Sequence, residues 1–174
     1  MSFSVQERGR AIATFRFVEV RLMEIAAGWT PTIPEMEVKV LFGRHIWDFA
    51  QHADALGKRT FELRLPEQHS LPPSEPFAQL LEDAARVGST SERLAVLYDV
   101  LLPGLEQRYR EYLAGTDTLV DAPSCVILER IIGDYARQRR DADRLRSEIG
   151  LPAAATHDLR RRDAAISTIV AAAV

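Results

Sequence analysis

Four long segments of this chain carry apolar residues at every third or fourth position, and this spacing constrains the fold more than any other feature. Such a period places the apolar residues of a segment on one face of an α-helix. The four segments span residues 4–29, 32–63, 89–115 and 121–149. No stretch alternates apolar and polar residues as a strand does. Because amphipathic helices must bury their apolar faces against one another, the sequence predicts an all-α protein built as a four-helix bundle.

The predicted helix limits depend on residues that start, bend or end a helix. The second segment is expected to begin near Thr32, with Pro34 in its first turn. One of residues 89–91 is expected to cap the third segment, and Pro103 is expected to kink or split it. The fourth segment ends at Gly150, because glycine readily adopts the left-handed conformation that closes many helices.

Two further stretches connect or follow the long segments. Residues 65–76 contain four prolines and no helical period, so they predict a long loop that allows a crossover connection. An extra short helix is expected at about residues 76–87. We expect residues 1–150 to form the bundle, and the alanine-rich residues 151–174 to form a weak last helix or an arm in an oligomer.

The composition argues against several classes of function. Because 22 Lys and Arg stand against 25 Asp and Glu, the net charge of -3 offers no positive field for nucleic acid or an anionic membrane. No apolar run approaches the roughly 20 residues that span a bilayer. No apolar secretion signal is visible, and the single cysteine, Cys125, cannot form an internal disulfide or a cysteine zinc cluster. We therefore expect a cytoplasmic protein without nucleic-acid or membrane partners.

Glu19 is a charged residue beside the apolar face of the first segment. Its helical neighbours, among them Phe15 and Leu22, are apolar, and only Arg16 nearby is charged. A carboxylate in such surroundings must be paired, protonated or bound to a metal. One interpretation is a salt bridge to Arg16 or to an arginine of another helix, and the other is a metal ligand.

His45, Asp48 and His52 lie on one side of the second segment, because their spacing is three and then four. Two imidazoles and a carboxylate are suitable ligands for iron, manganese or zinc. The alternative is a polar network in which Asp48 orients one histidine and the other histidine bonds to a hydroxyl in the core. Together with Glu19, these three residues are the predicted metal-ligand set.

The chain's four tyrosines all fall on predicted inward faces, and buried phenols need hydrogen-bond partners. With Gln138 they are the predicted ligand-binding set: Tyr98, Tyr109, Tyr112 and Tyr135. They predict a pocket for a small polar or aromatic ligand, or redox-active tyrosines near a metal. The alternative is core packing with satisfied hydroxyls.

Two segments resemble bacterial members of the ferritin-like superfamily. Residues 43–64, GRHIWDFAQHADALGKRTFELR, resemble the second helix of these proteins, and residues 116–138, TDTLVDAPSCVILERIIGDYARQ, resemble the lead into their last helix. The resemblance implies a four-helix bundle. In many relatives it also implies a di-iron or di-manganese centre for oxidation or metal storage.

Only part of the ligand pattern implied by the resemblance is present. Glu19 and His52 match it by position, whereas Phe49, Tyr135 and Gln138 depart from it. These departures favour a mononuclear or lost metal site over a dinuclear one. The cofactor is therefore expected to be none, or else iron or manganese.

These observations lead to two main hypotheses of function. The first is a homo-oligomeric small-ligand-binding or assembly module that has lost its metal centre. The second is an iron- or manganese-dependent oxidoreductase in which Glu19, Asp48 and His52 bind the ion. In that second hypothesis His45 binds or orients, and Tyr135 donates a proton or an electron. A third hypothesis is an accessory subunit whose tail packs on a partner.

Overall fold

The computed structural model describes residues 3–172, and its regular elements there are helices, apart from one isolated bridge between Pro73 and Val170. The all-α class expected from the sequence is therefore confirmed. In chain order the elements are α1 (Val5–Trp29), a 3₁₀ turn (Thr30–Thr32), α2 (Met36–Glu62), α3 (Glu75–Ala85), α4 (Thr90–Ala95), a π-helical segment (Val96–Leu101), α5 (Leu102–Gly115), α6 (Ala122–Ile149) and α7 (His157–Ala165). None of the described helices is long and apolar enough to cross a membrane.

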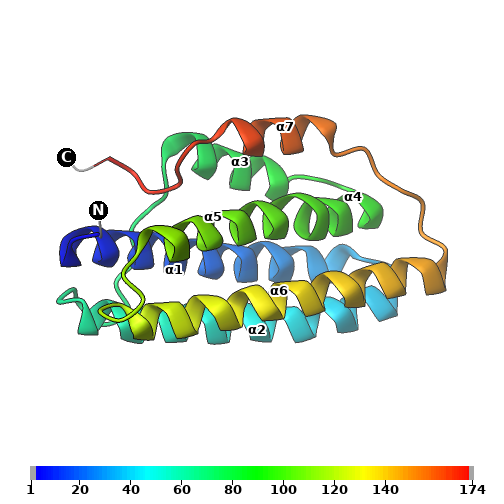
Figure 1. The fold of residues 1–174 in the computed structure, drawn as a ribbon. Coiled ribbons are helices and arrows are strands. Elements are labelled where there is room, and N and C mark those ends of the chain that lie inside the picture. Colours follow the sequence, from blue (N-terminus) through cyan, green and yellow to red (C-terminus); the bar gives the residue numbers. More distant parts are fainter. Residues whose placement is uncertain (1–2, 173–174) are drawn as a thin grey trace.

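The long helices α1, α2, α5 and α6 lie side by side, and α3 and α7 cover them on one side (Figure 1). Helices α2 and α5 run in the same direction, while α1 and α6 run in the opposite one (Figure 1). The chain therefore returns along the length of the molecule between α2 and α5. The proline-rich loop and α3 make this connection.

The start of α2 was predicted wrongly, since the helix begins at Met36 and not near Thr32. Thr32 belongs to the separate 3₁₀ turn, and Ile33 is extended with ψ of 126°. A residue that precedes proline is biased toward extended conformations, and Ile33, which precedes Pro34, adopts one. Pro34 therefore lies before the helix instead of in its first turn.

Pro103 neither ends nor splits the helical path, because a π-helical segment precedes it. Proline cannot donate a backbone hydrogen bond, and its ring clashes with the preceding turn. The chain widens here, and the amide of Leu102 donates to the carbonyl of Leu97, five residues back. This segment also carries Tyr98 into the core, where its side chain is 1% exposed.

A buried ion pair between Arg59 and Asp121 joins the end of α2 to the beginning of α6. Asp121 is fully buried and accepts hydrogen bonds from Arg59 at 2.9 Å, Ser124 at 2.6 Å, Tyr112 at 2.7 Å and Thr116 at 2.9 Å. Burial alone would raise the pKa of Asp121, but these hydrogen bonds outweigh it and lower the pKa. One carboxylate thus joins α2, α5 and α6.

We expect Asp121→Ala to lower the free energy of unfolding by about 3–5 kcal/mol, because Arg59 is left as a buried charge without this partner. Urea denaturation of Glu129→Ala provides the control, since Glu129 is an exposed residue of the same helix. Its loss should stay within about 0.5 kcal/mol. Equal small losses in the two variants would contradict the assigned role of Asp121.

Candidate functional site

Glu19 lies at the centre of the molecule and is the most enclosed carboxylate of the predicted metal set, with 0% of its surface exposed. Its Oε1 accepts hydrogen bonds from the hydroxyls of Tyr109, at 2.8 Å, and Tyr135. Its Oε2 lies 3.1 Å from Nδ1 of His52. Helix α1 supplies the carboxylate, and α2, α5 and α6 each supply one partner. The four long helices therefore meet at one side chain.

His52 bridges Glu19 to a second carboxylate, because its Nε2 lies 3.1 Å from Oδ2 of Asp134. Burial would lower the pKa of His52, but the charge of Glu19 and hydrogen bonds to both carboxylates outweigh it and raise the pKa to about 9. The hydrogen bond from His52 is the main cause that lowers the pKa of Asp134 to about 2. His52 is therefore an imidazolium that donates from both ring nitrogens.

The polar contacts continue from Asp134 toward the surface. Arg137 donates to Asp134 at 2.8 Å and to Asp48 at 2.9 Å. Gln138, which is fully buried, donates from its Nε2 to the same oxygen of Asp48 at 3.0 Å. Negative and positive groups thus alternate from Glu19 through His52, Asp134 and Arg137 to Asp48.

His45 is separate from this chain and bonds to a core hydroxyl. Its Nδ1 lies 2.6 Å from the hydroxyl oxygen of Tyr98, and its side chain is fully buried. Burial lowers the pKa of His45 to about 4, against the opposing charges of Asp48 and Asp141. The imidazole is therefore neutral at pH 7.

The tyrosines occupy three different surroundings and do not line one pocket. Tyr109 and Tyr135 stack with ring centroids 6.0 Å apart, and both hydroxyls donate to Glu19. Tyr98 bonds to His45, and Tyr112 bonds to Asp121. Burial raises the pKa of each of these phenols, so all four stay protonated.

The structure brings together only part of the predicted metal set. Glu19 and His52 are in contact, as one site requires, whereas Asp48 bonds to Arg137 and Gln138. The alternative prediction was a polar network in which one histidine bonds to a core hydroxyl, and His45 does so with Tyr98. That prediction had Asp48 orient the other histidine, but Glu19 and Asp134 orient His52 instead. Arg16, the other predicted partner of Glu19, donates instead to Gln68 and Ser70.

The residues that sequence reasoning missed lie on α6. Asp134 and Asp141 are seven residues apart, and so are His45 and His52 on α2. Residues seven apart lie on one face of a helix, so two antiparallel helices can bring two such pairs into contact at once. The equal intervals on α2 and α6 were therefore a sequence signal that could have identified the aspartates. Asp134 was not singled out from the sequence because it lies beside the predicted apolar face, and in the structure 24% of its side chain is exposed.

The side chains around Glu19 and His52 can hold protons and fixed charges. Among residues 3–172, no group of three or more His, Cys, Asp or Glu side chains is arranged to hold a metal ion. Both nitrogens of His52 already face carboxylate oxygens, and Glu19 already accepts from three donors. Glu19 and His52 thus satisfy each other, whereas Asp48 is held by Arg137 and Gln138 and His45 by Tyr98.

Comparison of the chain with models of known protein families, with curated proteins and with solved structures finds no match.

The charge on His52 predicts how stability depends on pH. An unfolded histidine has a pKa of about 6.5, and His52 in the folded protein has a pKa of about 9. Its contribution is therefore complete below pH about 6.5 and is lost as the pH rises through about 9, on the order of 3 kcal/mol. Urea denaturation between pH 6 and 10 measures this loss.

His52→Gln should remove that pH dependence, whereas His157→Gln should keep it, because His157 is exposed on α7. A His52→Gln protein whose stability falls over the same range as strongly as that of the unchanged protein would show that His52 is not the titrating group.

Proposed function

We propose that the chain is a ferritin-like four-helix-bundle protein that has lost its metal centre and binds a small molecule in a hollow beside α1. The directions of the four long helices and the long return between α2 and α5 support the ferritin-like assignment (Figure 1). Glu19 and His52 occupy the positions that the resemblance assigns to metal ligands. Their mutual hydrogen bond supports the loss of the metal centre.

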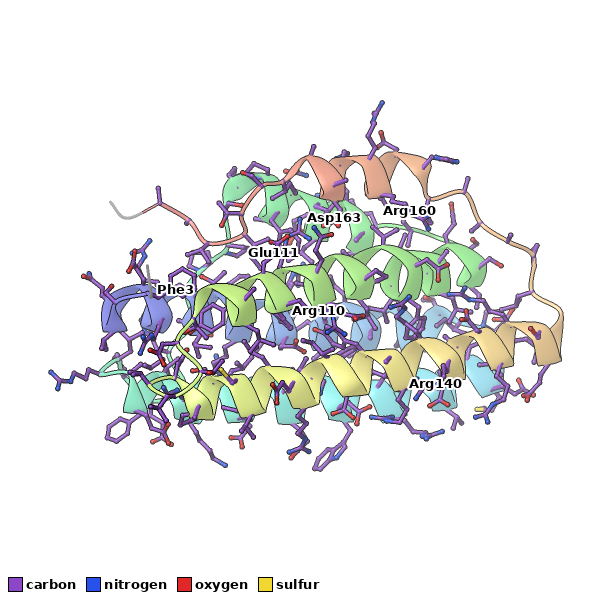
Figure 2. The ribbon with its side chains drawn as sticks, viewed as in Figure 1. Phe3, Arg110, Glu111, Arg140, Arg160 and Asp163 are labelled. Atoms are coloured by element: carbon purple, nitrogen blue, oxygen red, sulfur yellow. The ribbon has the colours of Figure 1, made fainter. Side chains whose placement is uncertain are left out.

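The observation that carries the ligand-binding function is a hollow of about 330 Å³ between α1, α5 and the segment that follows α7. Figure 2 labels two of its lining residues, Phe3 before α1 and Glu111 on α5. Its lining is mostly apolar. The residues that line it are Phe3, Glu7, Arg10, Ala11, Phe15, Arg108, Glu111, Tyr112, Ser167, Thr168, Ile169 and Val170.

The side chains of the hollow indicate which ligand it takes. Three aromatic residues and two aliphatic residues of the C-terminal segment offer contacts to an apolar or aromatic body. The lining carries equal numbers of positive side chains, Arg10 and Arg108, and negative ones, Glu7 and Glu111, while Arg108 is already paired with Asp163 at 2.8 Å. Two hydroxyls, from Ser167 and Thr168, can hydrogen-bond to a polar group. The ligand is therefore a small, mainly apolar molecule with an uncharged or zwitterionic head.

The proposed ligand site does not include most of the tyrosines that the sequence predicted to bind a ligand. Of the predicted ligand-binding residues, Tyr112 lines the hollow. Tyr98, Tyr109 and Tyr135 are fully engaged in the core, where their hydroxyls bond to protein groups. Tyr112 also holds Asp121, so ligand binding and the buried ion pair share one side chain.

The metal-dependent alternative makes a different demand on the same residues. An ion bound by Glu19, Asp48 and His52 requires His52 to lose a proton and to leave one of its two carboxylates. It also requires Asp48 to leave Arg137 and Gln138. For these reasons we propose ligand binding and not metal-dependent oxidation.

Ala11→Phe tests the hollow, because Ala11 is a lining residue with 7% exposure and a phenyl ring there fills the space. We expect the uncharged dye N-phenyl-1-naphthylamine to bind the unchanged protein at one site, with a rise in fluorescence, and Ala11→Phe to weaken binding at least tenfold. The matched control is Ala114→Phe, an exposed position on α5 outside the hollow, which should bind as before.

Two results would contradict this function. Dye binding that survives Ala11→Phe would place the site elsewhere. Near-stoichiometric iron or manganese in protein prepared without chelator, lost in His52→Ala, would favour the metal-dependent alternative. Elemental analysis of the same preparations supplies that second measurement.

A further inference from the structure

Two histidines of α2 face two aspartates of α6, and the two pairs differ in spacing. His52 Nε2 lies 3.1 Å from Asp134 Oδ2, within hydrogen-bond distance. His45 Nε2 lies 3.8 Å from Asp141 Oδ2, which is too long for a direct hydrogen bond. Two polar atoms that each bind one shared oxygen at about 2.8 Å can be separated by such a distance. The wider pair therefore leaves room for a bridging atom that lies to one side of the line between the two groups.

Three buried polar atoms on the facing sides of α2 and α6 have no hydrogen-bond partner among the described residues: His45 Nε2, Asp141 Oδ2 and, three residues before Asp141, Gln138 Oε1. The side chains of His45 and Gln138 are completely buried. Gln138 lies one turn before Asp141 on the same face of α6. Buried polar atoms are nearly always satisfied in folded proteins, so these three point to a ligand that the protein groups do not replace.

The neighbouring hydrogen bonds decide which of the three atoms carries a proton. Tyr98 is a protonated phenol, and His45 is the hydrogen-bond partner of its hydroxyl in the part of the chain that the structure describes. The hydroxyl therefore donates to Nδ1 of His45, which leaves the ring hydrogen on Nε2. Gln138 uses its Nε2 to donate to Asp48, so its Oε1 is an acceptor. The three atoms are one donor and two acceptors.

We propose that one water molecule binds between His45, Gln138 and Asp141 as an internal part of the protein. It accepts a hydrogen bond from His45 Nε2 and donates to Gln138 Oε1 and Asp141 Oδ2. Buried waters make about three hydrogen bonds, so a single molecule satisfies all three atoms. The water extends the contact between Tyr98 and His45 to Asp141, whose other oxygen accepts from the exposed Arg144 at 3.3 Å.

A metal ion fits the same place less well than water does. The ion would take the lone pair of His45 Nε2, which moves the ring hydrogen to Nδ1 and leaves the Tyr98 hydroxyl without its acceptor. Arg44 and Arg144 lie 4.0 and 3.3 Å from the oxygens of Asp141 and oppose further positive charge. The proton positions and the charges therefore both favour a neutral ligand.

A crystal structure of the unchanged protein at a resolution that shows ordered water provides the first test. We expect one solvent peak within about 3.2 Å of all three atoms, with no anomalous signal at the iron, manganese or zinc edges. A metal peak, no peak, or a direct hydrogen bond between His45 and Asp141 would overturn the proposal.

Solution NMR provides the second test, because a long-lived internal water gives a nuclear Overhauser effect to the ring protons of His45. We expect this effect in the unchanged protein with EDTA present, its loss in Asp141→Leu, and its retention in Asp143→Leu. Asp143 is the matched control, since 69% of its side chain is exposed on the same helix. An effect that persists in Asp141→Leu would overturn the assignment. If Asp141→Leu does not fold, the presence or absence of the effect in the unchanged protein decides whether the water is bound.

Discussion

The contact between the Glu19 carboxylate and the His52 imidazolium is the interaction on which the rest of this structure depends. A carboxylate without exposed surface is costly unless it is paired and hydrogen-bonded, and Glu19 receives a cation and two phenol hydroxyls. Because each partner comes from a different long helix, the relative placement of those helices is fixed by one polar centre as well as by apolar packing. Removal of any partner leaves the others with an uncompensated polar group.

The polar groups also divide the molecule into regions with different chemistry. The face of α6 toward α2 carries Asp134, Gln138 and Asp141, and it meets both histidines of α2. The hollow lies elsewhere, between α1, α5 and the C-terminal segment. A ligand in the hollow therefore leaves the Glu19 centre in place. The Glu19 centre is thus separate from the hollow beside Arg10 and Tyr112, where we propose that a ligand binds.

Apolar spacing predicted the helices well because each long helix buries one continuous face. The limits of α6 follow from Asp121 and Gly150, and the buried positions of Glu19, His45 and His52 follow from their apolar neighbours. The start of α2 was missed because Pro34 acts on the preceding residue, a local effect that the apolar period does not show. The π-helical segment before Pro103 was also missed, since its sequence has the same period as an α-helix.

Partners across helices were harder to predict than buried positions, because they depend on register. His52 was read with Asp48 on its own helix, whereas it bonds to Glu19 on α1 and Asp134 on α6. The hollow was beyond sequence reasoning, because it depends on how the segment after α7 returns to α1. Arg10 holds that segment by donating to the carbonyls of Ala171 and Ala172, a contact between residues more than 160 positions apart.

The protonation state of His52 in the folded protein tests this account most directly. Nitrogen-15 NMR of the histidine rings, assigned with His52→Gln, reports whether each ring nitrogen carries a hydrogen. We expect both nitrogens of His52 to be protonated at pH 7 and the ring to lose a proton only near pH 9. A neutral His52 ring at pH 7, titrating near the ordinary histidine pKa of about 6.5, would contradict it.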